Sequence, residues 1–364
     1  MSRPPSVDVE IVTARGARLD RLVPAWAALA AAHGRSFVSR PAYGLAWFGT
    51  LGGRGRLHVV AVRRAGVLVA LAPLHRRTLL GQPVLRWLGH GLGTIGEVLT
   101  ADEQAADALW TALAAQGAVL QLTHVRPDDP AILALRRHRG YAHHLRIDNR
   151  CPVIPLPPGT TARALRSKHS LARLARYRNA LTREDRPFRV EVVDTVDGLR
   201  RRWPDIVAVA AVADAGRDRD NLCGPPYDVF TFAVLDAEAG AGNLLVVGAL
   251  VGERWVAHDI GLRTGTVLEQ WLTRFDPELT KYSPGHLMRE WVVDHHDQLV
   301  VDTVDQLLGE TAIKLSWSLH GYDVATLTAA PTAAPTAAPS GLGLARARLG
   351  LAAALGDAVR RARR

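Results

Sequence analysis

The chain has 364 residues, 48% of them hydrophobic, and a formal net charge of +10 at pH 7. This length predicts two domains of about 150 residues each, and no stretch approaches the roughly 18 apolar residues that a membrane helix requires. The two cysteines lie in neither a C-x-x-C motif nor a Cys/His cluster, which argues against a disulfide framework and against a metal site. The N-terminal segment lacks the apolar core of a signal peptide, so we expect a cytoplasmic protein.

The first half of the chain alternates predicted strands and helices. Apolar and β-branched runs predict strands, and longer runs with helical periodicity predict helices. The predicted strands are 56–62, 67–74, 84–88, 119–123 and a segment near 144–147, and the predicted helices are 102–116 and a segment after Asp128.

A strongly basic segment separates the two halves. Residues 163–189 carry nine Arg or Lys against two acidic residues. Leucines recur among these arginines at spacings of about three and seven, which predicts a helix that docks through a narrow apolar stripe. A second basic segment, 341–364, has six arginines against one aspartate. Its apolar residues Leu344, Leu351, Leu355 and Val359 are compatible with a weak amphipathic helix, but four glycines oppose it, so we favour a disordered tail.

The second half repeats the order of the first. It has predicted strands at 244–250, 254–261, 267–275, 299–304 and 322–327, and predicted helices at 284–296 and 310–318. The shared order β-β-β-loop-α-β-α-β predicts an α/β (α+β) fold of two similar halves. Three copies of Thr-Ala-Ala-Pro follow, and this composition predicts a linker. The expected domains are 1–155 and 191–327, with a basic helix at 156–190, a linker at 328–340 and a disordered tail at 341–364.

A helix start in the second half is suited to an anion. Ser283 is expected at the N-cap and Pro284 at the first helical position. This leaves the backbone N–H groups of Gly285, His286 and Leu287 free at the positive end of the helix, and Gly285 removes a side chain where an anion would approach. We expect a pyrophosphate here, although an ordinary capped helix explains the same three residues.

Three stretches of the second half carry a family resemblance. They are Gly252-Glu-Arg-Trp-Val-Ala257, Phe275-Asp-Pro-Glu-Leu-Thr-Lys-Tyr-Ser-Pro-Gly285 and Asp305-Gln-Leu-Leu-Gly-Glu-Thr-Ala-Ile-Lys-Leu-Ser-Trp317. The chain resembles, over about residues 40–327, the BioF2-like (CelD/BcsL-type) acetyltransferases of the GNAT superfamily, and it is similar to the FemABX-type transferases. The resemblance implies tandem GNAT-like domains, each with a mixed, largely antiparallel sheet flanked by helices. It also implies a biosynthetic N-acyltransferase that takes an acyl group from acetyl-CoA or another acyl-CoA, with no bound cofactor.

Direct attack of an amine on a thioester requires orientation, removal of one proton and stabilisation of an oxyanion. We expect Asp305 or His286 to act as the base, and Lys314 to contact a phosphate or an acceptor carboxylate. Structural roles remain the alternative for all three. Residues expected to hold the donor are Arg274, Phe275, Tyr282, Ser283, Pro284, Gly285, His286 and Leu287, and residues expected near the acceptor are His90, Glu97 and Trp317.

The sequence departs from this family in three places, one of which is the stretch 217–227. The usual pyrophosphate signature Q/R-x-x-G-x-G/A is missing, and Ile313 stands where similar sequences have tyrosine, so residue 313 cannot act as a phenolic acid. A small-molecule or peptide amine is the expected acceptor. The alternative donor, an aminoacyl-tRNA as used by FemABX-type enzymes, would occupy the basic segment at Arg166, Lys168, Arg173 and Arg176.

Overall fold

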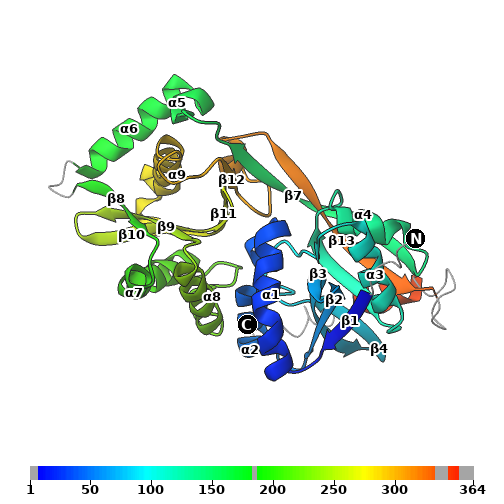
Figure 1. Cartoon of the computed structure of the whole chain (residues 1–364). Coiled ribbons are helices and arrows are strands. Elements are labelled where there is room, and N and C mark those ends of the chain that lie inside the picture. Colours follow the sequence, from blue (N-terminus) through cyan, green and yellow to red (C-terminus); the bar gives the residue numbers. More distant parts are fainter. Residues whose placement is uncertain (1–6, 183–186, 333–342, 352–364) are drawn as a thin grey trace. The chain divides into compact units, whose positions relative to one another are not determined.

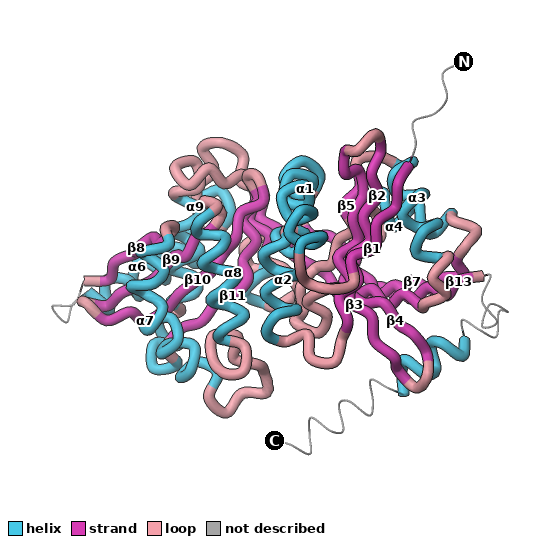
Figure 2. Tube along the Cα trace, turned by 60° about the horizontal axis from the view of Figure 1, so that its bottom comes forward, coloured by secondary structure: helices cyan, strands magenta, loops and turns pink. Residues whose placement is uncertain are grey.

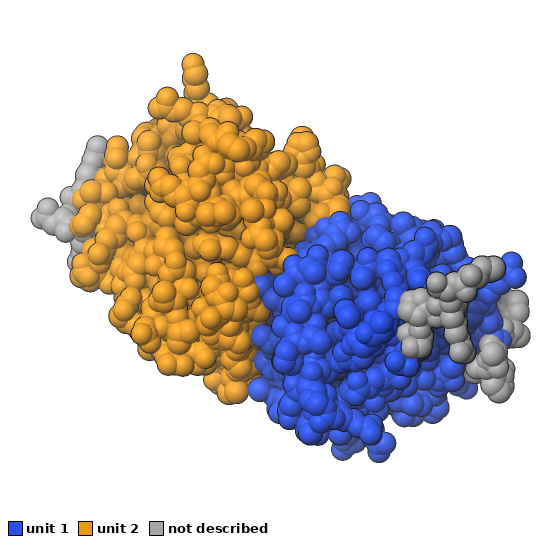
Figure 3. Space-filling model, in the orientation of Figure 1, with its two compact units in different colours: residues 1–149, 323–364 blue, residues 150–322 orange. Residues whose placement is uncertain are grey.

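The computed structural model describes residues 7–182, 187–332 and 343–351. The chain forms two compact units, which are coloured separately in Figure 3. Unit 1 comprises Met1–Asn149 and Asp323–Arg364, and unit 2 comprises Arg150–Tyr322. Within the described residues, no helix combines the length and apolarity needed to cross a membrane.

Unit 1 begins with a strand and two helices that precede its main strands. Its elements are β1 (Val7–Val12), α1 (Ala17–His33), η1 (Phe37–Ser39), α2 (Pro41–Thr50), β2 (Arg56–Arg64), β3 (Val67–Leu79), β4 (Gln82–Trp87), β5 (Leu99–Thr100), α3 (Glu103–Ala114), β6 (Val119–Val125), α4 (Pro130–Arg137) and β7 (Tyr141–Pro155).

The sheet of unit 1 is buried on both faces. Its strands follow the order β1-β2-β3-β4-β6, with the late strand β13 (Gly321–Pro331) next to β6. Strands β4 and β6 are parallel, and the other neighbours in this order are antiparallel. Val60 and Val62 pack with α3 and α4 in one core. Leu57, Val59 and Ala61, which alternate with them along β2, are equally buried. Apolar side chains on both faces of one strand therefore require helices on both sides.

Unit 2 has the same sequence of element types, preceded by two short basic helices. Its elements are α5 (Ala162–Leu165), α6 (Lys168–Thr182), β8 (Phe188–Val193), α7 (Val196–Asp214), α8 (Asp228–Gly240), β9 (Leu244–Val251), β10 (Arg254–Thr264), β11 (Val267–Phe275), η2 (Pro277–Tyr282), α9 (Pro284–Asp294), β12 (Thr303–Asp305) and α10 (Ala312–Leu315). The last strand, β13 (Gly321–Pro331), starts in unit 2 and lies mostly in unit 1.

The sheet of unit 2 runs in the order β7-β12-β11-β10-β9-β8, and β8 to β11 can be followed side by side in Figure 2. Only the β11–β12 pair is parallel among the strand pairs of this sheet. Figure 1 shows α7 and α8 on one face of the sheet, and α6 and α9 on the other. Met288 and Val292 of α9 are fully buried against Val247 and Val256 of the sheet, so this helix is fixed by its apolar side.

The two units repeat one order of elements. With the short elements η1, β5 and η2 set aside, each reads β-α-α-β-β-β-α-β-α-β, starting at β1 and at β8. The expected fold class, an α/β fold whose two halves each have a mixed, largely antiparallel sheet flanked by helices, is confirmed. The strand β1, the helices α1, α2, α7 and α8, and the strand β8 were not predicted from the sequence.

The last strand of each repeat pairs with the other repeat. β7 ends the first repeat, and its residues 153–155 pair with β12 of unit 2. β13 ends the second repeat, and residues 325–329 pair with β6 of unit 1. The boundaries of the units therefore differ from the expected boundaries at 155 and 327. The expected boundaries treat each half as a contiguous segment and do not include this exchange of strands.

Two expectations for the C-terminal region require correction. The expected linker 328–340 starts too early, because Thr328, Ala329 and Ala330 are buried in β13. The expected disordered tail contains a helix at residues 343–351, which buries Ala345 and Leu349 in one apolar cluster of unit 1. Packing on unit 1 outweighs the low helix propensity of the glycines. The remaining tail residues lie outside the described part of the chain.

Candidate functional site

The open edge of β11 is the first element of the site. β11 and β12 pair in parallel only from Val267 to Glu269, although β11 continues to Phe275. The backbone N–H of Asp276 donates to Val256 of β10 at 2.8 Å. Since N–H groups of successive residues in a strand point to opposite edges, the N–H of Phe275 points away from β10. Arg274 and Phe275 are both expected to hold the donor. Phe275 presents its backbone N–H at this edge, and Arg274 does not.

The start of α9 lies directly after β11 and η2. Ser283 is the residue before the helix, as expected, but it adopts a left-handed conformation with φ 52° and its side chain makes no capping hydrogen bond. The N–H groups of His286 and Leu287 donate to the carbonyl of Ser283 at 2.9 and 3.3 Å. The expectation that both N–H groups are free is therefore wrong.

Gly285 remains the open position at this helix end. A Cβ atom built on Gly285 would meet no atom within 4 Å. The positive end of α9 still faces this space because the peptide dipoles of its 11 residues point toward it. The first turn of α9 can therefore admit an anion beside Gly285. Tyr282, just before it, is half-buried and lies under the Lys281 ammonium, 4.9 Å from its ring centre.

His286 is held by Trp317. The indole Nε1–H of Trp317 donates to His286 Nδ1 at 2.9 Å, so the neutral ring carries its proton on Nε2. Burial is the main cause that lowers the pKa of His286 to about 4, and the charges of Arg166 and Arg173 add to it. In this arrangement His286 has no lone pair to accept a proton, and it can only donate from Nε2. Trp317 is buried in the core of unit 2 rather than on a cleft wall.

Asp305 and Lys314 meet around the turn after β12. Asp305 is 1% exposed and accepts hydrogen bonds from the Tyr322 hydroxyl at 2.6 Å and from the N–H of Leu307 at 2.8 Å. The Lys314 amine donates to the carbonyls of Leu307 and Leu308 at 3.1 and 2.6 Å, and burial lowers its pKa to about 8. Both side chains thus stabilise one turn, which supports the structural alternative for each.

The expected helix 310–318 is reduced to α10, four residues long. Trp317 lies beyond its end, so Lys314 and Trp317 do not share a helix face. The carbonyl of Lys314 accepts from the Trp317 N–H at 3.1 Å instead, which closes a turn.

A buried polar network, missed at the sequence level, connects the sheet to α9. Arg289 and Asp259 lie 3.8 Å apart, with side chains 9% and 4% exposed. Arg289 also donates to Gln306, next to Asp305, and Asp259 accepts from Thr273 at 2.9 Å. Burial raises the pKa of Asp259, and Arg289 opposes that shift. The burial of Arg289 cannot be recognised from the sequence, because charged residues on helices are usually exposed. The burial of Asp259 can be recognised, because it lies inside the apolar run of β10.

The opposite face of β11 carries a second missed cluster. Arg274 donates to Asp214 at the end of α7, at 2.8 Å, and Arg219 donates to the other oxygen of the same carboxylate. The side chain of Arg274 is thus committed to an ion pair. His258, opposite Arg274 in the β10–β11 ladder, is fully buried, and neither of its ring nitrogens has a hydrogen-bond partner in the described part of the chain.

The buried His258 should make the folding stability of unit 2 sensitive to acid. Burial, with a smaller effect of Arg274, lowers the pKa of His258 to about 3. Between that value and an unfolded pKa of about 6.5, the unfolded chain binds the proton and the folded chain does not, so stability falls as the pH falls. From pH 7 to pH 5 the loss from this residue should be about 2 kcal/mol.

Urea denaturation of the His258→Leu variant at both pH values measures this loss. The variant should lose about 2 kcal/mol less than the unsubstituted protein between pH 7 and pH 5. His169→Leu, a change at an exposed histidine of α6, is the control and should leave the difference unchanged. An equal loss in all three proteins would contradict this account of His258.

The basic helix α6 docks beside the start of α9, as its apolar stripe predicts. Leu174 and Leu181 pack with Leu287 of α9. The cations expected to contact nucleic acid divide into two kinds. Arg166 lies 5.0 Å from the ring centre of Trp317 and donates to the carbonyl of Ser316, so it is a packing residue. The other three are exposed on α6: Lys168, Arg173 and Arg176.

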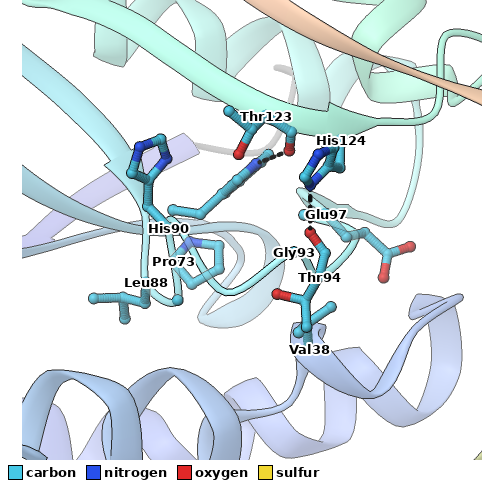
Figure 4. A pocket seen from close by; sticks show the side chains of 13 residues that line it. Val38, Pro73, Leu88, His90, Gly93, Thr94, Glu97, Thr123 and His124 are labelled. Atoms are coloured by element: carbon cyan, nitrogen blue, oxygen red, sulfur yellow. Dashed lines mark hydrogen bonds between the residues drawn. The ribbon is translucent and has the colours of Figure 1, made fainter. Parts of the chain in front are cut away.

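His90 and Glu97 line one pocket of unit 1, as Figure 4 shows. Burial is the main cause that lowers the pKa of His90 to about 3. Both oxygens of Glu97 accept from the N–H of Arg35, at 2.9 and 3.0 Å. The pocket has a volume of about 10 Å³, which is room for about one water molecule. An amine acceptor does not fit there in this conformation.

Comparison with known proteins finds a family that part of this chain resembles. Residues 168–315, which lie within unit 2, match the sequence profile of a family described as "Acetyltransferase (GNAT) domain". This part of the chain is therefore similar to a GNAT acetyltransferase domain, which indicates a transferase. A search of curated protein sequences finds no match.

Solved structures show the same fold over most of the chain. The structure of FemX superposes with a TM-score of 0.60 at 12% identity, covering 87% of this chain and 96% of that one. A conserved protein of unknown function from Bacteroides thetaiotaomicron VPI-5482 gives a TM-score of 0.57 at 11% identity, covering 88% and 100%. L-PGS from Bacillus licheniformis gives 0.50 at 13% identity, covering 87% and 94%.

Proposed function

We propose that the chain is an N-acyltransferase that moves an acyl group, acetyl in the simplest case, from acyl-CoA to an amine on a small molecule or peptide. The observation that carries this proposal is the open space at Gly285, at the start of α9 and directly after the unpaired edge of β11. A pyrophosphate would lie at the helix end, and the pantetheine arm would follow β11 in the manner of an added strand.

The chemistry requires few side chains. The amine nitrogen forms a bond to the thioester carbonyl carbon, the carbon–sulfur bond breaks, and the CoA thiolate leaves while the amine loses one proton. The N–H of Phe275, at the open edge of β11, would stabilise the developing oxyanion. His286 would donate from Nε2 to the donor, because its Nδ1 is occupied by Trp317. Proton removal then proceeds through water, and orientation supplies most of the acceleration.

The exposed cations of α6 would complete the phosphate site. The usual glycine-rich phosphate signature is missing from this sequence, and Arg173 acts electrostatically on His286 in the first turn of α9. A cation supplied from α6 would thus offset the loss of the free N–H groups of His286 and Leu287.

An aminoacyl-tRNA donor is the second candidate. The fold is shared with FemX, and α6 presents Lys168, Arg173 and Arg176 to solvent. In that case the helix end of α9 would serve the aminoacyl end of the tRNA, and the reaction would form an amide by the same attack on an activated carbonyl.

The two donors are distinguished by ligand-dependent thermal stability. Acetyl-CoA at 100 times its Kd should stabilise the folded state by about 2.7 kcal/mol, which raises the Tm by about 2–4 °C per kcal/mol for a unit of this size. Acetyl-CoA analogues without the phosphates should give no rise. A Tm that responds to aminoacyl-tRNA but not to acetyl-CoA would replace the first candidate by the second, and a response to neither would remove both.

A further inference from the structure

An open groove of unit 1 lies outside both sites described above. It has a volume of about 620 Å³ and is formed where β2 begins and β3 passes beside it. Arginine is the most frequent residue in its lining. The lining consists of Thr13, Arg54, Arg56, Leu57, His58, Arg76, Arg77 and Thr78.

The four arginines of this groove lack compensating charge. In the part of the chain that the structure describes, none of them forms an ion pair with a carboxylate, whereas Arg64 at the other end of β2 is paired with Asp102 at 2.9 Å. The groove keeps a local excess of positive charge that would attract an anion.

Two of the arginines lie directly opposite each other on neighbouring strands. Arg56 of β2 and Arg76 of β3 are direct partners in the antiparallel register. Like charges at directly opposite positions destabilise a strand pair, so this pair is unfavourable for the isolated fold. A bound anion that contacts both guanidinium groups would relieve the repulsion.

The character of the lining favours a nucleic-acid backbone over other anions. Leu57, the one apolar side chain of the lining, is fully buried, whereas a membrane-binding surface combines cations with exposed apolar side chains. Arg54 and Arg56 at the start of β2 are exposed to solvent, and Arg76 lies beside Arg56 on the neighbouring strand. Spread, exposed arginines suit a row of phosphates rather than one enclosed phosphate.

We propose that this groove binds the phosphodiester backbone of a nucleic acid. The guanidinium groups of Arg56 and Arg76 form the centre of the contact, and Arg54, two residues before Arg56, extends it. The inference does not depend on the donor used by unit 2, because the groove and the start of α9 belong to different units.

The test is salt-dependent binding of the full chain to fluorescent tRNA and to duplex DNA of similar length. Each phosphate contact contributes about 0.7–0.9 to the slope of log K against log salt. The Arg56→Gln/Arg76→Gln variant should therefore lower that slope by about 1.4–1.8 and weaken binding about tenfold at 50 mM salt. Arg136→Gln/Arg139→Gln, at exposed positions of unit 1 outside the groove, removes the same charge and should change neither quantity by as much.

The comparison of probes separates the possible sources of the anion. Loss of tRNA binding alone, or of tRNA and DNA binding together, in the groove variant supports the proposal. Equal behaviour of the groove variant and the control overturns it. Binding to anionic phosphatidylglycerol vesicles that depends on Arg56 and Arg76, without binding to either nucleic acid, also overturns it. Circular dichroism establishes that both variants are folded.

Discussion

Replacement of Arg289 by leucine should lower the free energy of unfolding of unit 2 by about 3–5 kcal/mol. The change removes the partner of Asp259, which is 4% exposed and lies 3.8 Å from the guanidinium. It also leaves Gln306 without the guanidinium that contacts it. An unpaired carboxylate inside a protein costs several kcal/mol or takes up a proton.

The pH dependence of this variant follows from the same carboxylate. Burial already raises the pKa of Asp259, and loss of the Arg289 charge removes an interaction that opposes the rise. The folded variant then holds a proton that the unfolded chain releases, so its stability decreases as the pH increases. The destabilisation measured at pH 8 should therefore exceed that measured at pH 5.

Urea denaturation, with unit 2 followed by hydrogen exchange of α9 peptides, measures the loss. Arg178→Leu is the matched control, because Arg178 pairs with the neighbouring Glu290 at 2.6 Å but is 42% exposed. It should cost no more than about 1 kcal/mol. Asp259→Asn should restore part of the stability of Arg289→Leu. If Arg289→Leu costs no more than Arg178→Leu, or if Asp259→Asn adds a further full loss, the network does not hold α9 to the sheet.

Replacement of Gly285 by valine should weaken acetyl-CoA binding at least about tenfold, which is 1.4 kcal/mol. The space beside Gly285 is empty of protein atoms within 4 Å of an added Cβ, so valine fits the folded protein. Its methyl groups would instead occupy the space in which a phosphate approaches the helix end. The loss should appear in the affinity for acetyl-CoA and not in the stability of the free protein.

Gly240→Val provides the control for this substitution. Gly240 is the last residue of α8, and a Cβ atom there also meets nothing within 4 Å. Calorimetric titration with acetyl-CoA should give the unsubstituted affinity for Gly240→Val and the weakened affinity for Gly285→Val. Equal affinities for the two variants would place the donor away from the start of α9.

The helix start at the site is predictable because it depends on local rules. Pro284 fixes the first helical position whatever surrounds it, and an added Cβ at Gly285 would meet no atom within 4 Å. The left-handed conformation of Ser283 is not predictable in this way, since it depends on how η2 delivers the chain to α9. Because of this left-handed conformation, the carbonyl of Ser283 accepts hydrogen bonds from the N–H groups of the first turn.

The roles of Asp305 and Lys314 are set by residues distant in the fold. The sequence places Asp305 at a strand end, where a catalytic carboxylate and a structural one have the same pattern. The hydrogen bond from Tyr322, whose hydroxyl occupies one carboxylate oxygen, favours the structural role. Distant residues also determine the structure at Thr328. Its Thr-Ala-Ala-Pro context predicts a linker, but pairing with Gln121 of β6 makes it part of a strand.

Hydrogen–deuterium exchange of the full chain, with and without saturating acetyl-CoA, tests the placement of the donor most directly. The amides of residues 270–287, from the open edge of β11 to the first turn of α9, should exchange more slowly in the presence of acetyl-CoA, and peptides of unit 1 should not change. Slower exchange confined to other segments, or the absence of any change at saturating acetyl-CoA, would contradict a donor site at Phe275 and Gly285.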